Sequence, residues 1–447
     1  MVKILLTALI AITSLSTAAA DETSAPATVI SLDQALQIAL SESPTVKVAD
    51  KEIEVQQYAK KGTYASLFPE IAASGSFNRT LKKQVMSMDF GGESQSFEVG
   101  RWNTVSGGIS ASMPLINAQV WKSLEISGQD VELAVEKARS SRLEMVTQVK
   151  QAYYAVLLAK EVHSVYQSVY DNAVANCEQT QKRYNASKAS ELDLTRAKTT
   201  VANAVPNVYD SENSIAIALW QLKAVMGVNL DENIDVAGSL QDYVGEMLYD
   251  ANGDYSLENN SSLRQLELQA EQLANNIKLQ KFANLPSLAL GFSYTMNAME
   301  DELNFSEYNW YPYSYLGLSL NIPIFSGGKR NSSLKQAQIQ ADELQLQKEN
   351  TERQLRIGIR QYLGTMDTAN KSYASALEAQ ESAQKAYDIA AKSYNVGRST
   401  LTDLNDSQLA LTQAQLSVSQ AIYNFLVAKS NLEQTIGTDY MQYEEAK

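Results

Sequence analysis

Four stretches of the chain alternate between apolar residues and small polar residues, which is the pattern of β-strands whose two faces differ. They are predicted at about residues 70–80, 102–113, 287–297 and 313–323. A proline stands beside each of them: Pro69, Pro114, Pro286 and Pro323. Proline lacks the N–H that a continuing helix needs and biases the preceding residue toward extended geometry. These positions therefore mark joints between helices and strands.

Each predicted strand has about the 9–11 residues that cross a bilayer when tilted. Aromatic residues gather near the start of the last strand, where an interfacial girdle would lie: Tyr308, Trp310, Tyr311, Tyr313 and Tyr315. The alternative is an antiparallel sheet packed on a soluble core. The membrane interpretation is favoured because the helices between the strands are expected to pack their apolar faces against one another, and not against the sheet. The polar stretch from Leu81 to Trp102 is predicted to be a loop.

Outside the strands, apolar residues recur every three to four positions, which predicts helices. The stretch 32–65 holds two of them, the second beginning at Pro44. Another runs without a breaker from about 117 to 184, ~65 residues and ~100 Å at 1.5 Å per residue. The apolar seam at 145–177 steps by four and three, and it recurs in the same register at 355–387, interrupted only by Gln380. A 3.5-residue repeat predicts left-handed coiled-coil packing.

One motif begins at Tyr184 and occurs again 210 residues later, at Tyr394. Each copy contains the Ser/Thr-x-x-Asp pattern of a helix start, Ser190 with Asp193 and Thr400 with Asp403. In this pattern the side chains satisfy the unpaired N–H groups of the first helical turn. Each copy therefore marks a hairpin between a long helix and a helix that runs back beside it.

The duplication sets the domain organisation. Lys3, the apolar run that follows it and the small residues ending at Ala20 are typical of a cleaved secretory signal peptide. The predicted segments are a signal peptide at 1–20, a first structural repeat at 21–227, an equatorial elaboration on the surface at 228–257, a second structural repeat at 258–437 and a C-terminal tail at 438–447.

Composition excludes several classes of function. The chain has 447 residues, a net charge of −14, one His and one Cys. The acidic balance argues against nucleic acid as a partner. His163 and Cys177 both fall in the apolar seam, so we predict no metal, no cofactor and no enzymatic site. No stretch after residue 20 approaches the ~20 apolar residues of a transmembrane helix, so a membrane would have to be crossed by strands.

Four strands cannot close a barrel, and open strand edges in lipid would leave backbone groups unpaired. Two chains would give eight strands, whose bore side chains largely fill, whereas three would give twelve and an open bore. The predicted fold is therefore mainly helical with transmembrane strands. A homotrimer would form a 12-stranded β-barrel, with four strands per protomer, continuous with an antiparallel coiled-coil helical barrel.

The chain resembles the TolC family of outer-membrane efflux proteins over nearly all of its mature length. The features that carry the resemblance are the opening segment that ends in Leu67-Phe68-Pro69, the strand end Ile322-Pro323-Ile324-Phe325-Ser326-Gly327-Gly328, and Tyr394-x-x-Gly397-x-x-Thr400-x-x-Asp403-Leu404. The resemblance implies a trimeric channel-tunnel in contact with outer-membrane lipid. It also implies a periplasmic adaptor, an inner-membrane pump or translocator beyond it, and a gate at the periplasmic tip.

The twin motifs would form that tip. In the family, the positions of Asp403 and Asp406 line the closed aperture as acidic rings, and those of Asp193 and Tyr394 are hydrogen-bonded across neighbouring coiled coils. An arginine usual after Arg398 is replaced here by Ser399. Ser187 likewise stands where the second copy has Gly397, and serine is disfavoured where a helix ends in left-handed geometry.

Plainer interpretations stay open for these residues: helix caps for Asp193 and Asp403, a solvated face for Asp406, and a seam position for Tyr394. Two functions are also open. The first is a passive export duct. The second is a non-conducting periplasmic scaffold or surface protein that uses the same coiled coils. The small residues on the strand faces favour the duct, because a scaffold needs no small-residue lumen.

Overall fold

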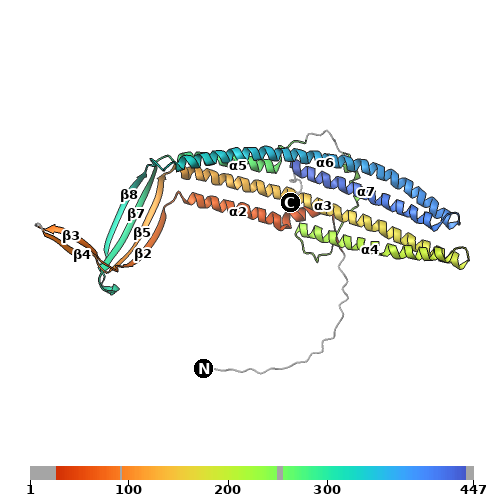
Figure 1. The fold of residues 1–447 in the computed structure, drawn as a ribbon, viewed down its shortest axis with the longest axis horizontal. Coiled ribbons are helices and arrows are strands. Elements are labelled where there is room, and N and C mark those ends of the chain that lie inside the picture. Colours follow the sequence, from red (N-terminus) through yellow and green to blue (C-terminus); the bar gives the residue numbers. More distant parts are fainter. Residues whose placement is uncertain (1–26, 91–92, 249–254, 439–447) are drawn as a thin grey trace, which may run out of the picture.

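The computed structural model describes residues 27–90, 93–248 and 255–438. The signal peptide predicted at 1–20 and nearly all of the tail predicted at 438–447 lie outside these residues. The chain forms a long helical rod with a β-sheet at one end and two helical hairpins at the other (Figure 1).

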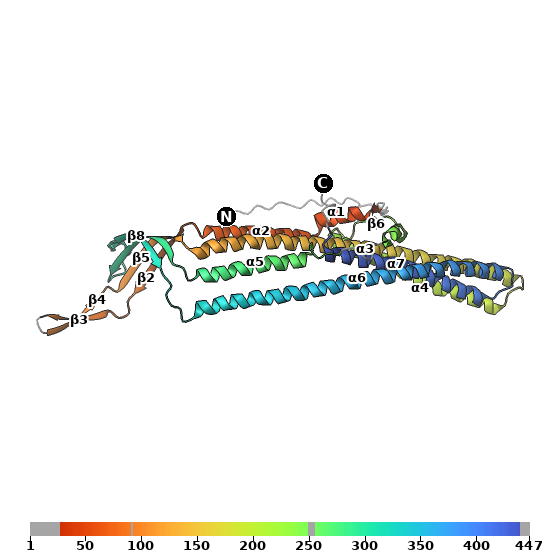
Figure 2. The ribbon, with the colours of Figure 1, turned by 90° about the horizontal axis from the view of Figure 1, so that it is seen from above.

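The rod is built from paired helices. Their bounds are α1 (Leu32–Glu42), α2 (Pro44–Ala65), α3 (Ala118–Asn185), α4 (Glu191–Met226), α5 (Ser261–Phe282), α6 (Lys329–Asn395) and α7 (Leu401–Ile436). Figures 1 and 2 show α4 running back beside α3, and α7 beside α6, from the same end of the molecule. The long helix predicted from about residue 117 is α3, 68 residues in length, and Asn117 caps it by accepting from the amide N–H of Gln119.

None of the helices among the described residues carries an apolar run of the length and purity needed to span a bilayer.

The sheet has four strands in the order β2–β5–β7–β8, and all neighbours are antiparallel. They are β2 (Glu70–Arg79), β5 (Asn103–Ile116), β7 (Ser287–Glu300) and β8 (Tyr311–Asn321). Each repeat contributes two strands. Within the described chain β2 and β8 are the edges of the sheet, and β2 is exposed along its whole length.

Two predictions about this region are wrong. Pro114 does not close its strand: β5 continues to Ile116, and the register shifts between the two residues, at the kind of bulge where a sheet accepts proline. The predicted loop from Leu81 to Trp102 contains a second antiparallel pair, β3 (Gln84–Phe90) and β4 (Glu93–Val99). The polar composition of this stretch concealed its alternation.

The main hydrophobic core lies at the middle of the rod, away from the sheet. Its largest fully buried side chains include Tyr153 of α3 and Phe425 of α7. The segment 228–257 was expected to lie on the surface, and this is wrong in part. It forms the strand β6 (Ile234–Val236), which pairs with β1 (Thr28–Ile30), and the 3-10 helix η1 (Leu240–Met247). The buried residues in the described part of this segment are Ile234, Val236, Leu240 and Met247.

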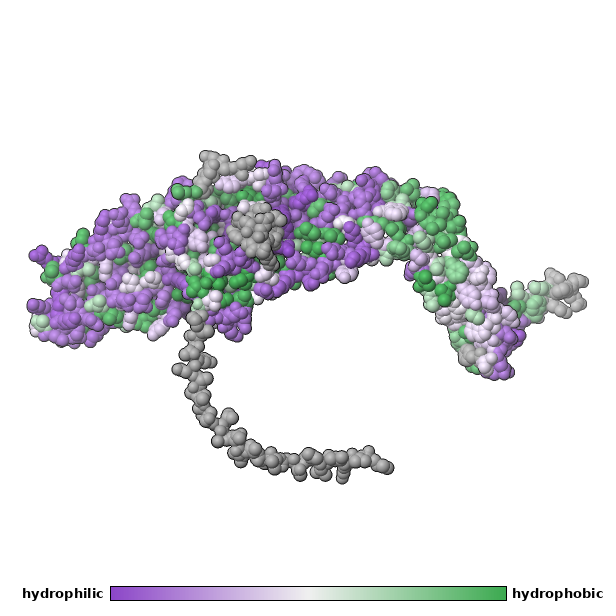
Figure 3. All heavy atoms as spheres, turned by 180° about the vertical axis from the view of Figure 1, so that it is seen from behind, coloured by the Kyte–Doolittle hydropathy of each residue, from purple (hydrophilic) through white to green (hydrophobic). Residues whose placement is uncertain are grey.

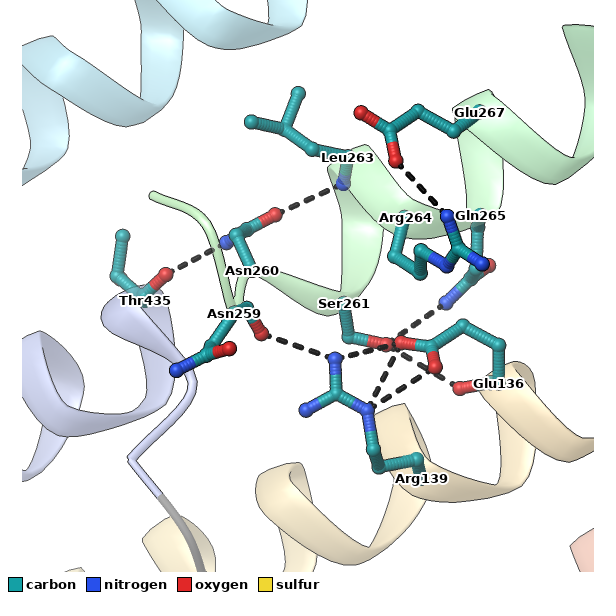
Figure 4. A network of polar contacts seen from close by, with 10 residues as sticks. All are labelled: Glu136, Arg139, Asn259, Asn260, Ser261, Leu263, Arg264, Gln265, Glu267 and Thr435. Carbon is teal, nitrogen blue, oxygen red and sulfur yellow. Dashed lines mark hydrogen bonds and ion pairs between the residues drawn. The ribbon is translucent and has the colours of Figure 1, made fainter. Parts of the chain in front are cut away.

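A polar network joins the two repeats at the same level (Figure 4). Asn260 caps α5 by accepting from the amide N–H of Leu263, and its own side-chain amide donates to the carbonyl oxygen of Thr435, 2.6 Å away. The guanidinium of Arg139 donates to the carbonyl oxygen of Asn259, 2.9 Å away. The end of α7 is thus held against the start of α5 and against α3.

Gly437 ends α7 in left-handed geometry, with φ of +72°. A Cβ atom at this position would lie 2.1 Å from the Asn259 carbonyl oxygen, a backbone atom inside the network. We expect Gly437→Ala to lower the free energy of unfolding by about 2–4 kcal/mol, because strain and overlap add. Gly364→Ala is the matched control: Gly364 lies inside α6 with nothing within 4 Å, so a gain of about 0.5–1 kcal/mol is expected. Thermal unfolding followed by circular dichroism measures both, and equal effects would contradict the role assigned to Gly437.

Candidate gate at the helical tips

The two hairpin turns have the same cap chemistry. Ser190 caps α4: its hydroxyl oxygen accepts from the Asp193 amide, and the Asp193 carboxylate accepts from the Ser190 amide and hydroxyl. Thr400 and Asp403 repeat the arrangement at the start of α7, with distances of 2.7–3.1 Å. These bonds satisfy the orphan N–H groups of each first turn, so Asp193 and Asp403 are helix caps whatever else they do.

Hydrogen bonding also fixes the charge of both carboxyls. The Ser190 side chain, followed by its amide, holds the pKa of Asp193 below its ordinary value. The amide and side chain of Thr400, with the hydroxyl of Ser399, lower the pKa of Asp403 in the same way. A carboxyl with a lowered pKa keeps its charge at a lower pH than a free one. Both carboxyls therefore stay charged at any pH near neutrality.

The two turns differ where the incoming helix ends. The residue in left-handed geometry is Gly397 after α6, with φ of +79°, and Ser187 after α3, with φ of +57°. Among the described residues, Ser187 is the one non-glycine with positive φ. This agrees with the expectation from the sequence that serine is strained there.

Tyr394 is the residue that joins the two hairpins. Its side chain is 4 % exposed, and its hydroxyl lies 2.5 Å from the hydroxyl oxygen of Thr180 on α3. The Arg183 guanidinium stacks over the Tyr394 ring at 5.0 Å and donates to the Tyr394 carbonyl oxygen, 2.7 Å away. A cation at this place also interacts favourably with the C-terminal end of α6. We call these three residues the Tyr394 contact.

An apolar cluster lies beneath the Tyr394 contact. Its buried members come from both hairpins: Ala197, Ala390, Tyr394, Leu401 and Leu404. Farther along the rod, the side-chain amide of Asn172 on α3 donates to Gln408 on α7, 3.2 Å away. The hairpins are therefore held together by packing and by a few specific polar bonds.

The tips of the two hairpins are not level. Helices α3 and α6 both run toward the tips. The residue of α3 that corresponds to Tyr394 in the repeat is Tyr184, but Tyr394 lies opposite Thr180, four residues farther from the tip. Helices α4 and α7 both run away from the tips. The residue of α4 that corresponds to Asn405 is Thr195, but the Asn405 side-chain amide donates to Thr200, five residues farther from the tip. Both shifts have the same sense, so the α3–α4 hairpin projects ~6–8 Å farther at 1.5 Å per residue.

The predicted site residues are thus only partly brought together. Asp193 accepts from Ser190, and in the described part of the chain it makes no hydrogen bond to Tyr394. Asp406 is exposed one turn after Asp403, with no ion pair among the described residues, and Tyr184 is 39 % exposed. Sequence reasoning missed the side chains that Tyr394 does contact. The available signal was the presence of a hydroxyl and a cation, Thr180 and Arg183, three residues apart just before the first motif.

Paired helices that end in an open-edged antiparallel sheet are the fold of outer-membrane efflux channels. The crystal structure of the CmeC outer membrane channel of Campylobacter jejuni superposes with a TM-score of 0.72, at 17 % identity, covering 91 % of this chain and 85 % of that one. The chain belongs to the outer membrane efflux protein family, whose profile matches residues 35–228 and 253–438.

Two curated relatives support the assignment. Outer membrane protein TolC of Vibrio cholerae is 24 % identical over 243 residues, which are 52 % of this chain and 54 % of that protein. The probable efflux pump outer membrane protein TtgC of Pseudomonas putida is 23 % identical over 362 residues, 78 % of this chain and 68 % of that protein. The chain spans about half the length of the TolC proteins it matches. Membership in this family places the protein in the outer membrane, with its helices on the periplasmic side.

The strained serine yields a test of the turn geometry. We expect Ser187→Gly to raise the free energy of unfolding by about 1 kcal/mol, because it removes the cost of left-handed geometry for a side-chain-bearing residue. The reciprocal change Gly397→Ser should be destabilising, since φ is +79° and a Cβ atom there would lie 3.3 Å from the Arg183 guanidinium. Denaturant titration of both variants measures the two signs, and two changes of the same sign would contradict the strain assigned to Ser187.

Proposed function

We propose that the chain is one subunit of a homotrimeric channel-tunnel that conducts substrates passively from the periplasm to the exterior. The observation that carries the proposal is the four-stranded sheet with two open edges, β2 and β8, at one end of a helical rod. Unpaired edges cannot face lipid, so other copies must pair with them. Three copies would supply twelve strands and leave a bore, whereas two would supply eight and fill it.

The tips would dock to a periplasmic adaptor, and through it to an inner-membrane pump or a secretion translocator. The location of the capped hairpins supports this, because they are the end of the molecule farthest from the sheet (Figure 1). The duct is proposed to need no cofactor. A non-conducting scaffold with the same helices is the competing function, and conductance separates the two.

The gate would have two parts. Asp403 and Asp406 would line the aperture, three copies of each around the axis, and would favour cations. The Tyr394 contact would hold the α6–α7 hairpin against the α3–α4 hairpin and so keep the aperture narrow. This assignment replaces the bond between Asp193 and Tyr394 that the family resemblance implied.

Conductance tests the duct and its acidic ring. The purified protein in a planar bilayer should form pores that divalent cations block, because the carboxylates gather at one level. Replacing Asp403 and Asp406 together by Ala should abolish the block, and Asp388→Ala, an exposed aspartate on α6, should leave it intact. Because the hydrogen bonds lower the pKa of Asp403, its charge should persist to a lower pH than that of an ordinary aspartate, and the block should persist with it.

The absence of pores in both the parent protein and the Asp403→Ala, Asp406→Ala variant would overturn the duct. Pores without a divalent block would overturn only the acidic ring.

The Tyr394 contact is tested separately. Tyr394→Phe removes the hydroxyl that bonds to Thr180, and a hydrogen bond of this kind contributes about 1 kcal/mol, or roughly fivefold in an opening equilibrium. We expect a severalfold rise in closed-state conductance and greater sensitivity of cells to large antibiotics. Thr180→Val should have the same effect, and the double variant should add little. Tyr184→Phe is the matched control, since this tyrosine occupies the same place in the other copy of the motif but is exposed. Equal behaviour of the two Tyr→Phe variants would contradict the gate.

A further inference from the structure

The hairpin of β3 and β4 has one apolar face and one polar face. In its register Met86 pairs with Phe97, and Gln84 pairs with Val99. Met88 lies on the same face as these residues, because side chains alternate along a strand. The other face is mostly polar: it carries Ser87, Ser96 and Glu98 together with one apolar residue, Val85, which is 56 % exposed. The apolar side chains are largely exposed within one chain: Met86 42 %, Met88 45 %, Phe97 41 % and Val99 38 %.

The hairpin projects from the end of the sheet that is remote from the helices (Figures 1 and 2). In the space-filling view, apolar side chains reach the surface of this arm (Figure 3). An isolated two-stranded hairpin is marginal in water unless it packs against something. Among the described residues β3 and β4 pair only with each other, so this sheet gains no third strand within its own chain.

Specific bonds at the base nevertheless fix the direction of the arm. The Asp301 carboxylate, just after β7, accepts from the Lys83 ammonium at 3.1 Å, the Arg101 guanidinium at 2.6 Å and the Trp102 amide at 3.0 Å. Lys83 and Arg101 precede and follow the hairpin, so one carboxylate clamps both of its strands. These bonds hold the pKa of Asp301 down at about 2, which keeps the clamp charged. An arm held in one direction presents its apolar face to one place.

We propose that this apolar face packs against a neighbouring copy of the same chain at the outer mouth of the channel. The hairpin follows directly from β2, an edge strand, and so it begins at the seam where another copy must pair. In an antiparallel pairing of β2 with the β8 edge of the next copy, the outer end of β2 meets the start of β8. Exposed apolar residues stand on both sides of that seam, with Leu81 92 % exposed on one and Tyr311 67 % exposed on the other.

The second repeat offers no comparable arm. Between β7 and β8 the chain forms only the short 3-10 turn η2 (Phe305–Glu307). A trimer would therefore carry three arms, one for each seam, and each arm would bracket two subunits. The inference goes beyond the proposed conduction and gating, but it relies on the same association through sheet edges. Its test must separate the arm from the seam.

Site-specific photo-crosslinking in the full-length protein in membranes makes this separation. We would place p-benzoylphenylalanine at Phe97 on the apolar face, at Ser96 on the polar face, and at Tyr315 on the edge strand β8. We expect crosslinks between two copies from Phe97 and Tyr315 and at most a tenth of that yield from Ser96. Crosslinks from Tyr315 together with none between copies from Phe97, or lipid adducts only at Phe97, would overturn the proposal. Failure at Tyr315 as well would overturn the association that the proposed function needs.

A variant gives a second, independent readout. Met86, Met88 and Phe97 replaced together by Thr keep β-propensity and remove the apolar face. We expect the trimer to dissociate in detergent at a temperature at least 5 °C lower, with the single-channel conductance unchanged. A matched change of Ser96 and Glu98 to Thr on the polar face should not lower it. An unchanged dissociation temperature in the apolar-face variant would contradict the proposal.

Discussion

The unpaired edges of one small sheet constrain the whole structure. Strand β2 is exposed along its entire length, and neither it nor β8 has a strand on its outer side in the described chain. In water such edges invite aggregation, and in lipid they are prohibitively costly. The main hydrophobic core of the subunit lies instead at the middle of the rod, around Tyr153 and Phe425. The sheet is therefore not what holds the subunit together.

At the tips, a few side chains serve two purposes: they cap helices, and they hold the two hairpins in contact. Asp193 and Asp403 cap the starts of α4 and α7, and this is the same chemistry in both hairpins. Contact between the hairpins near the tips depends on other residues: Tyr394 bonds to Thr180 and Arg183 of α3, beside a small apolar cluster. A phenol, a hydroxyl and a guanidinium form a contact of modest free energy, which would suit the proposed opening of the tips. Stronger coupling would hold the hairpins together permanently.

Much of this was predictable from the sequence, for reasons that individual residues make plain. Prolines mark joints because they cannot continue a helix, and so the four strands of the sheet and the start of α3 lie close to where the pattern puts them. A capping box lies within four consecutive residues, so the helix starts at Ser190 and Thr400 could be predicted from the Asp three positions later. The β3–β4 hairpin was missed because polar residues diluted its alternation. Thr180 and Arg183 were missed because contacts between α3 and α6 join positions more than 200 residues apart.

The offset between the two hairpins has a consequence for how the rod meets whatever lies beneath it. In a three-fold ring the three α3–α4 tips would form outer prongs that project farther along the axis than the α6–α7 tips. The difference of ~6–8 Å is about the length of one extended arginine side chain. A partner rising from the inner membrane would therefore touch the prongs first and could pull them outward before reaching the recessed carboxylates. Because Arg183 and Thr180 belong to the prongs, that first touch would act on the side chains that hold Tyr394. Docking and unlocking would then be one mechanical event.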